Sequence, residues 1–217
     1  MQDSIVSKTI QFVRDTLAEA EGGHDWFHIE RVYKSAINIA NHEAGANLLI
    51  VQLASLLHDI ADSKFHGGDE KIGPEKARQF LESQAVEAPI VEAVIAIIEN
   101  MSFHKSIEGT TYQSLELDIV QDADRLDAIG AIGIARTFNY GGFKNRKIYD
   151  PAISPQFFTS KESYKKSDSP TLNHFYEKLL LLKDLMTTPT AQAMAEQRHA
   201  FMEAFLSQFY AEWEGEF

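Results

Sequence analysis

The amino-acid sequence predicts an all-α protein. Apolar residues recur at the spacing of one face of a helix in one segment after another. Glycine and proline stand where helices would stop and start, as at Gly22, Gly23 and Pro74. We find no stretch with the alternation of apolar and polar residues that is typical of a half-buried strand. We therefore expect a bundle of helices without a sheet.

The segment 47–62 is predicted to contain the central helix. No side chain from Ala44 to Leu57 carries a charge, and a helix that is apolar all round is typical of a buried position. The segment is too short to cross a bilayer, which takes about 20 residues. The apolar run ends at His58 and Asp59. Burying these two groups costs several kcal/mol unless a partner such as a bound cation compensates them.

Apolar stripes and stop signals predict the other helices in order. We expect them over residues 4–19, 25–44, 74–83, 89–101, 115–129, 128–138, 170–186 and 189–213. The pairs Ser169-Pro170 and Thr188-Pro189 suit an N-cap followed by the first helical residue. Each pair therefore predicts the start of one of the last two helices.

Charge and cysteine content restrict the partners of the chain. A net charge of −12 disfavours a nucleic-acid polymer as a partner, because affinity for phosphate backbones comes from basic patches, but it leaves room for a small anionic ligand. The sequence contains no cysteine, which excludes thiolate metal sites and thiol nucleophiles and suits a reducing compartment. The amphipathic N-terminus carries Asp3, Lys8 and Arg14, so it predicts neither a signal peptide nor a membrane anchor. We expect a cytoplasmic protein that does not bind membranes.

Four polar side chains are expected to point into the helical core. They are His28 near the start of the second helix, His58 and Asp59 at the end of the central helix, and Asp124 in the apolar stripe of the helix over 115–129. Two imidazoles and two carboxylates form a mixed nitrogen and oxygen set that suits Mn, Fe, Co, Ni, Zn or Mg. A single buried histidine is more often a hydrogen-bonded core residue, but four such groups together favour one divalent cation.

Three motifs resemble those of a known family. HDWFHIERV around His28, LLHDIADSKF around His58 and Asp59, and VQDADRLDAIGAIGIARTF around Asp124 are similar to the H…HD…D pattern of the HD-domain metal-dependent phosphohydrolases. YGGFKNRKIYDP, NHFYEKLLLLKDLM and RHAFMEAFLSQFYAEW resemble the bacterial YpgQ/YedJ-type subgroup of that family. The resemblance implies an HD-domain helical bundle with a C-terminal helical extension. It implies a single domain over residues 1–217, with a metal core at about 20–130, a basic loop at 139–169 and C-terminal helices at 170–214.

The resemblance also implies roles for individual residues. His28, His58, Asp59 and Asp124 would hold one divalent cation, and Asp62 stands where the family keeps an acid that assists a water molecule. Asp59 and Asp62 are therefore the candidate catalytic residues. The implied activity is the cleavage of nucleoside triphosphates, often deoxy forms, to monophosphate and pyrophosphate. Asp62 is shorter than the glutamate of some HD nucleotidases, so a helix cap or an ion pair stays an alternative role for it.

Positive side chains are the candidates for binding a polyphosphate, because phosphoryl transfer mainly needs charge to be neutralised and groups to be aligned. The candidates are Lys64, Arg125, Lys144, Arg146, Lys147, His174 and Lys178. Lys64 lies closest in sequence to the metal motif, and His174 and Lys178 share one helix face at i, i+4 spacing. A solvated loop is the alternative for residues 144–147.

Other functions stay open at this point. Within the hydrolases, the alternatives are a 5′-nucleotidase and a guanosine polyphosphate hydrolase. A di-iron oxygenase would need further ligands, for which His66 and His104 are candidates. A non-catalytic nucleotide sensor would bind without turnover.

Several polar and aromatic residues have a structural interpretation. His24 and Asp25 are expected to hold the start of the second helix, with contact to a ligand as the alternative. Asp122 and Asp127 are expected to face solvent or form ion pairs rather than bind metal. Aromatic side chains recur at every fourth position in the last helix, namely at Phe201, Phe205, Phe209 and Trp213. They predict a core or dimer surface, so a homodimer is an open alternative.

Overall fold

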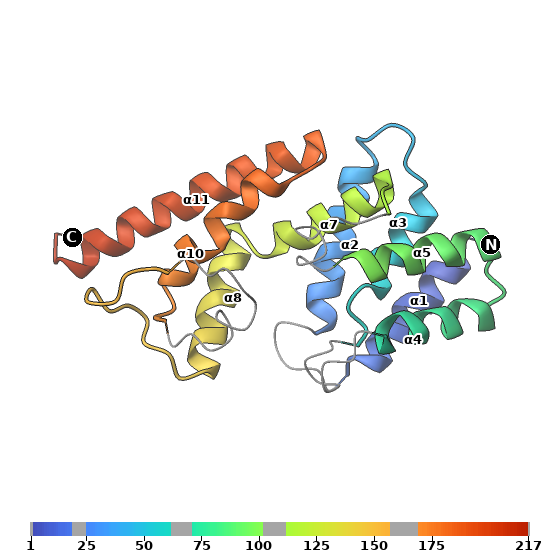
Figure 1. The fold of residues 1–217 in the computed structure, drawn as a ribbon, viewed down its shortest axis with the longest axis horizontal. Coiled ribbons are helices and arrows are strands. Elements are labelled where there is room, and N and C mark those ends of the chain that lie inside the picture. Colours follow the sequence, from blue (N-terminus) through green and yellow to red (C-terminus); the bar gives the residue numbers. More distant parts are fainter. Residues whose placement is uncertain (1, 19–24, 62–70, 102–111, 157–168, 217) are drawn as a thin grey trace. The chain divides into compact units, whose positions relative to one another are not determined.

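Helices make up all of the regular secondary structure that the computed structural model describes, in residues 2–18, 25–61, 71–101, 112–156 and 169–216 (Figure 1). This confirms the all-α prediction. Within those ranges, we find no helix with the length and hydropathy that crossing a bilayer requires. The chain divides into two compact units, Met1–Asp124 and Arg125–Phe217, each with its own packing.

The first unit is built around the predicted central helix. Its elements are α1 (Gln2–Thr16), α2 (Trp26–Ala40), α3 (Leu48–Leu57), α4 (Ile72–Ser83), α5 (Ala88–Asn100) and α7 (Leu115–Asp127), whose last turn extends into the second unit. Helix α3 packs against α1, α2 and α5, which confirms its central position (Figure 1). The side chain of Asn47 caps α3 by accepting a hydrogen bond of 3.3 Å from the amide of Ile50.

Burial of aliphatic side chains fixes α3 in this unit. Val51, Leu53, Leu56 and Leu57 have no exposed surface. Each buried side chain of this size stabilises a fold by about 1.5–3 kcal/mol. The last of them directly precedes His58, so the packing of α3 determines where that imidazole lies.

Helix α4 ends in a left-handed residue. Ala85 has φ +55°, its amide donates to the carbonyl of Glu82 over 2.9 Å, and the amide of Val86 donates to the carbonyl of Leu81 over 3.2 Å. These two bonds form a Schellman motif, in which the left-handed position usually holds glycine. An alanine at this position therefore carries backbone strain.

The second unit contains α8 (Gly130–Phe143), α10 (Asn173–Glu177), the 3₁₀ helix η2 (Leu179–Leu185) and α11 (Pro189–Trp213). Helix α11 packs against α8 and η2, and α10 packs against η2. The expected cap of α11 is confirmed, because the side chain of Thr188 accepts a hydrogen bond of 3.3 Å from the amide of Ala191.

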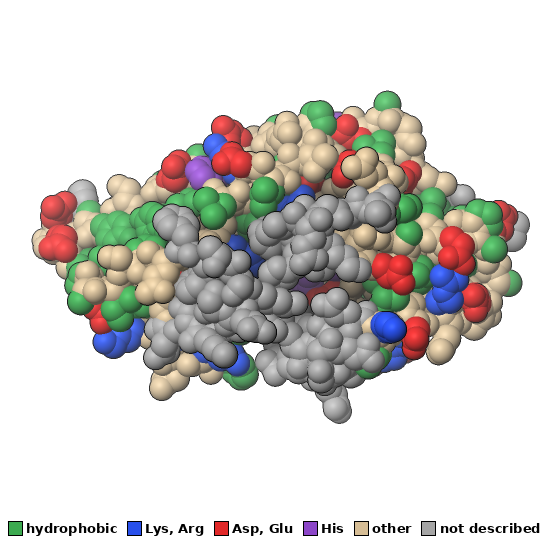
Figure 2. Space-filling model, in the orientation of Figure 1, with side chains coloured by type: hydrophobic (Ala, Val, Ile, Leu, Met, Phe, Trp, Pro, Cys, Tyr) green, Lys and Arg blue, Asp and Glu red, His purple; other side chains and the backbone are tan. Residues whose placement is uncertain are grey.

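Aromatic rings of α11 contribute to the packing of this unit. The ring centroid of Phe205 lies 5.9 Å from that of Phe138 and 5.8 Å from that of Phe175. Tyr149 packs edge-on against Trp213 at 4.9 Å. Figure 2 shows apolar side chains gathered over the C-terminal half of α11, while Phe201 is 54% exposed. Phe205 therefore packs against the buried ring of Phe175 but is itself half-buried, and the homodimer stays a prediction.

Three predictions for the second unit were wrong. The segment 170–186 is not one helix, because the backbone of Lys178 (φ −147°, ψ −55°) separates α10 from η2. Ser169 is not an N-cap; its hydroxyl group donates to Oε1 of Glu177 over 2.8 Å and accepts from Nδ2 of Asn173 over 3.1 Å. The predicted basic loop also begins later than residue 139, because α8 continues to Phe143.

Candidate metal centre

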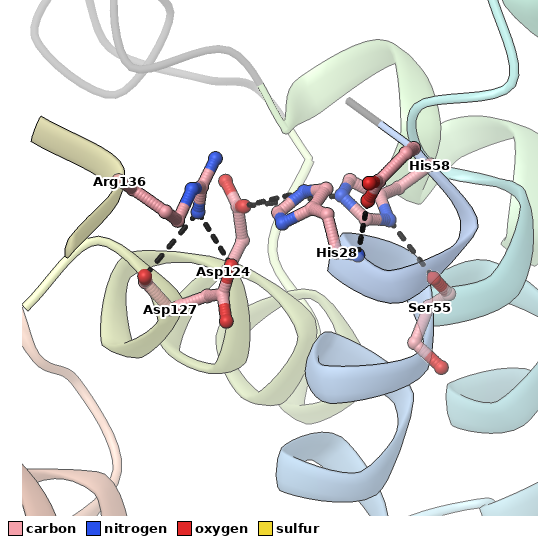
Figure 3. Close-up of polar contacts among 7 residues, drawn as sticks. His28, Ser55, His58, Asp124, Asp127 and Arg136 are labelled. Atoms are coloured by element: carbon pink, nitrogen blue, oxygen red, sulfur yellow. Dashed lines mark hydrogen bonds and ion pairs between the residues drawn. The ribbon is translucent and has the colours of Figure 1, made fainter. Parts of the chain in front are cut away.

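Three of the expected ligands converge in the first unit. Nε2 of His28 lies 3.5 Å from Oδ1 of Asp124, and Nε2 of His58 lies 3.8 Å from the same oxygen. All three atoms lie within 4.8 Å of one another. Figure 3 shows the two imidazoles and the carboxylate pointing toward one another from α2, the end of α3 and α7.

The start of α2 positions His28. Asp25 is the N-cap, and its carboxylate accepts a hydrogen bond of 3.0 Å from the amide of His28. This confirms the structural role expected for Asp25. The neighbouring side chains Ile29 and Val32 have no exposed surface and His28 itself is 3% exposed, so the imidazole is anchored in the core.

A hydrogen bond to the main chain orients His58. Its Nδ1 atom lies 2.8 Å from the carbonyl oxygen of Ser55 (Figure 3). A carbonyl oxygen only accepts hydrogen bonds, so Nδ1 is the donor, and the matching neutral tautomer has its lone pair on Nε2. Metal-binding histidines are commonly oriented in this way, with the second ring nitrogen donating to a carbonyl or carboxylate.

The geometry of His58 fits a metal ligand. Its Nε2 atom is buried and has no hydrogen-bond partner among the described residues. Buried polar atoms are almost always satisfied in proteins, so an orphaned nitrogen that faces a carboxylate indicates a place for a cation. Two imidazole nitrogens and one carboxylate oxygen suit a divalent transition metal and leave coordination positions for water or substrate. His28, His58 and Asp124 therefore form a group that could hold a divalent metal ion.

The other residues expected near the metal have different outcomes. Asp59 is partly exposed and is not in the group of three, so its role as a ligand stays a prediction. Asp62 and Lys64 lie outside the described residues, as do His24, His66 and His104.

The two acids that flank Asp124 are both buried. Asp127 is 3% exposed and pairs with Arg136, whose Nη1 atom lies 2.5 Å from its Oδ2 atom, which confirms the expected ion pair. Asp122 has no exposed surface, so the solvent-facing alternative was wrong for it, and the ion-pair alternative stays a prediction. The apolar stripe of the helix did not reveal this burial, because α7 is covered on more than one face.

Two of the expected phosphate-binding cations make contacts within the second unit. Nη1 of Arg125 donates to the carbonyl oxygen of Leu185 over 2.8 Å. Nζ of Lys147 lies 2.8 Å from Oδ2 of Asp150, and this contact, together with the amide of Ala152, lowers the pKa of the Asp150 carboxyl group. Arg125 therefore already interacts with a main-chain carbonyl, and Lys147 with a carboxylate.

Another three of the expected residues interact with one another in the second unit. The pKa of His174 is lowered from its ordinary 6.5 to about 3, mainly by burial and also by the positive charges of Lys178 and Arg146. Lys144 lies above the ring of Tyr140, with Nζ at 5.6 Å from the ring centroid. The expected cations thus have different surroundings in the structure. Arg125 and Lys147 contact oxygen atoms of the protein, Arg146 and Lys178 lie near His174, and Lys144 lies above an aromatic ring.

Sequence reasoning missed the main-chain part of the site. The carbonyl of Ser55 defines the tautomer of His58, but a carbonyl group is present at every position and leaves no pattern in the sequence.

Comparisons with known proteins identify the family. The family model described as HD domain matches residues 26–129. YpgQ of Bacillus subtilis (strain 168) is 37% identical over 198 residues, covering 91% of this chain and 88% of YpgQ. The crystal structure of YpgQ in complex with ADP superposes with a TM-score of 0.74 at 33% identity, over 97% of this chain and 96% of that one.

Two further crystal structures superpose over nearly the whole chain. A protein from Lactobacillus plantarum has a TM-score of 0.83 at 41% identity, with 99% of both chains covered. An HD-superfamily hydrolase from Bacillus thuringiensis has a TM-score of 0.80 at 46% identity, again with 99% of both chains covered. Together with the convergence of His28, His58 and Asp124, these similarities show that the chain belongs to the HD-domain family of metal-dependent phosphohydrolases, in the group that includes YpgQ.

Proposed function

We propose that this protein hydrolyses nucleoside triphosphates, including deoxy forms, to nucleoside monophosphate and pyrophosphate with the help of one divalent cation. The observation that carries the proposal is the convergence of Nε2 of His28, Nε2 of His58 and Oδ1 of Asp124. The ADP complex of YpgQ supports a nucleotide as the substrate, since YpgQ is similar to this chain over most of its length.

The residues of the chain provide what such a hydrolysis needs. His28 and His58 would donate nitrogen lone pairs to the cation, and Asp124 would balance part of its charge. A cation bound there would polarise a phosphoryl oxygen and lower the pKa of a water molecule, which supplies a nucleophile near neutral pH. The chain contains no cysteine, so water is the expected nucleophile rather than a thiolate.

The proposed reaction assigns a role to the two candidate catalytic acids. The oxygen of water attacks the α-phosphorus, the bond from this phosphorus to the oxygen that bridges to the β-phosphate breaks, and pyrophosphate leaves. Asp62 would accept the proton of the attacking water. Asp59 would act as the fourth metal ligand, next to His58 in the chain.

A product assay tests the proposed reaction. The purified protein is incubated with ribo- and deoxyribonucleotide mono-, di- and triphosphates and with Mn²⁺, Mg²⁺, Co²⁺, Ni²⁺, Fe²⁺ or Zn²⁺, and pyrophosphate and orthophosphate are measured separately. We expect pyrophosphate and a monophosphate from triphosphates. Orthophosphate released from a monophosphate would instead support a 5′-nucleotidase, and binding without turnover would support a nucleotide sensor.

A matched pair of histidine variants connects this activity to the metal centre. His58→Ala should lower kcat at least about a thousandfold, because it removes a metal ligand. The control is His42→Ala, since His42 is exposed and its Nδ1 atom also contacts a main-chain carbonyl, that of Asn38, at 2.7 Å. Equal activity of both variants would contradict the proposal.

A further inference from the structure

The last turn of α7 carries Asp124, three residues before the helix ends. The four carbonyl groups at the end of any helix have no amide partner within that helix, so they need other donors. The amides of the two residues that follow α7, Ala128 and Ile129, donate three residues back, over 3.1 and 3.3 Å. Such short-range bonds tighten the end of a helix, and they supply main-chain donors for this turn.

Two arginines from other helices also contact this turn. Nη1 of Arg136, from α8, donates to the carbonyl oxygen of Asp127 over 3.2 Å and pairs with the carboxylate of the same residue (Figure 3). Nη1 of Arg198, from α11, donates to the carbonyl oxygen of Leu126. A positive charge at the C-terminal end of a helix also interacts favourably with the helix dipole. Side chains of α8 and α11 therefore hold the end of α7.

Close packing fixes the side chain of Arg198. Gly130 has φ +73°, and a Cβ atom there would lie 2.9 Å from Cγ of Arg198, so the arginine stem lies directly against the glycine backbone. Burial lowers the pKa of Arg198, and the negative charge of Asp127 opposes this effect. A guanidinium group nevertheless keeps its charge at neutral pH. Arg198 thus combines a packed stem with a charged head that reaches α7.

The position of Asp124 depends on the backbone of this turn more than on packing around its carboxylate. Its side chain is 41% exposed, whereas those of His28 and His58 are 4% and 5% exposed. Asp124 precedes Leu126 and Asp127 by two and three residues, which is less than one helical turn. A shift of their carbonyl groups would therefore also move Asp124. Bonds of about 2.0–2.2 Å between a metal and its ligands tolerate little displacement.

We propose that Arg136 and Arg198 are positioning residues for the metal centre, which hold the last turn of α7 so that Asp124 reaches the same cation as the two imidazoles. Neither arginine is a metal ligand. They act through the main chain of α7, on which the carboxylate of Asp124 stands. This inference rests on the metal-binding part of the proposed function and does not depend on which substrate is cleaved.

Electrostatics alone predicts the opposite effect on metal binding. Both arginines are positively charged and repel a divalent cation, so removing either charge would by itself strengthen metal binding. Displacement of Asp124 would weaken it. The sign of the change in metal affinity therefore separates a positioning role from a general charge effect.

Calorimetric titration of the metal-free, full-length protein with Mn²⁺, in the absence of nucleotide, tests the proposal. The variants Arg136→Met and Arg198→Met keep an unbranched stem but lose the guanidinium group. We expect each to raise the Kd for Mn²⁺ about tenfold, which is the lower end of the effect that follows the loss of a group orienting a metal ligand. Arg198→Lys retains a charged donor, so its Kd should lie between those of the wild type and Arg198→Met.

Thr188→Ala is the matched control for lost stability, because it removes the N-cap of α11, the helix that carries Arg198. It should lower the Tm but leave the Kd for Mn²⁺ within about twofold of the wild type. An unchanged or lower Kd in Arg136→Met or Arg198→Met would overturn the role of that arginine. A tenfold rise in Thr188→Ala as well would mean that lost stability alone weakens metal binding, and it would overturn both roles.

The outcome can be separated from that of the proposed reaction. If the wild type bound Mn²⁺ without cleaving triphosphates, and both methionine variants bound it more weakly, the hydrolysis would fail and the positioning role would stand. If the wild type cleaved triphosphates and both variants bound Mn²⁺ as tightly as it does, the positioning role would fail and the hydrolysis would stand. Wild-type protein that binds neither Mn²⁺ nor any other metal of the product assay would overturn both.

Discussion

Oδ1 of Asp124 lies 3.5 Å from Nε2 of His28, so a carboxylate of α7 meets an imidazole of α2. The distance is longer than a normal hydrogen bond between these atoms and leaves room for an ion that both could contact. The same oxygen also faces the orphaned nitrogen of His58 at 3.8 Å. Asp124 is therefore the shared partner of both imidazoles, and its charge is the part of the site that a conservative substitution can remove.

Asp124→Asn should lose the bound divalent metal. The amide keeps the shape of the side chain but removes the negative charge that balances the cation. Metal binding stabilises a folded protein by about 2.7 kcal/mol when the free metal is at 100 times its Kd. We expect elemental analysis to find metal in the wild type but not in the variant, and added Mn²⁺ to raise the Tm of the wild type only.

Asp118→Asn is the control for that experiment, because Asp118 lies on the same helix as Asp124 but about one third of a turn away around its axis. It should retain its metal. Unchanged metal content in Asp124→Asn, measured beside this control, would contradict the assignment of Asp124 as a ligand.

Arg136→Met should destabilise the second unit by about 1.5–3 kcal/mol, because it removes a hydrogen-bonded cation from a buried carboxylate, and the positive charge of Arg198 compensates only part of this loss. The Asp127 carboxylate that remains is only 4% exposed. Urea unfolding of the wild type, Arg136→Met, Asp127→Asn and the double variant measures the effect. The double variant should be more stable than the sum of the single changes predicts, and simple additivity would argue against a coupled pair.

Ala85→Gly should stabilise the first unit by about 0.5–1 kcal/mol. Glycine adopts the left-handed conformation without the steric cost that Ala85 meets at φ +55°. Gln84→Gly is the control, because Gln84 has φ −92° and gains nothing from glycine. Thermal unfolding should show a higher Tm for Ala85→Gly and a lower one for Gln84→Gly, and a lower Tm in both variants would contradict the explanation by strain.

His174 should make the stability of the protein depend on pH in mildly acidic solution. Its pKa is about 3 in the folded protein, mainly because of burial, and is close to 6.5 in an unfolded chain. As the pH falls, the unfolded state therefore binds a proton at a higher pH than the folded state does. The stability that is fully present above pH 6.5 is lost as the pH falls toward 3. The expected slope reaches about 1.4 kcal/mol per pH unit in this window.

His174→Gln provides the comparison, since glutamine does not titrate. The difference in free energy of unfolding between wild type and variant, measured in urea from pH 7.5 to 4.5, should become less favourable to the wild type as the pH falls. A constant difference across that range would show that His174 does not have a lowered pKa.

Helical periodicity predicted the fold because it reports which face of each helix is buried. Val32 and Leu56 lie in the core as their stripes indicated, and the abrupt end of the apolar run correctly placed His58 at the edge of that core. The same stripes correctly placed His28 in the core and turned Asp124 toward it, but the expected burial of Asp124 was wrong, since its side chain is 41% exposed. Local pattern was sufficient for these residues because each of them lies on, or directly after, a regular helix with one apolar side.

The sequence did not predict how the cations of the second unit are divided. Lys147 contacts Asp150 and Arg146 approaches His174, although the two cations are adjacent in the chain. This division depends on a left-handed residue at Asn145 and on hydrogen bonds to a distant segment, neither of which follows a period. The break at Lys178 was missed for the same reason, since the apolar pattern continues across it.

The contact between Nδ1 of His58 and the carbonyl of Ser55 has a consequence for the engineering of the centre. Because the acceptor belongs to the polypeptide backbone, replacing the side chain at position 55 cannot remove it as long as the last turn of α3 keeps its shape. Substitutions at position 55 should therefore leave the proton on Nδ1 of His58. Efforts to change which ion the protein prefers should be directed at Asp124, whose carboxylate can be exchanged without disturbing that turn.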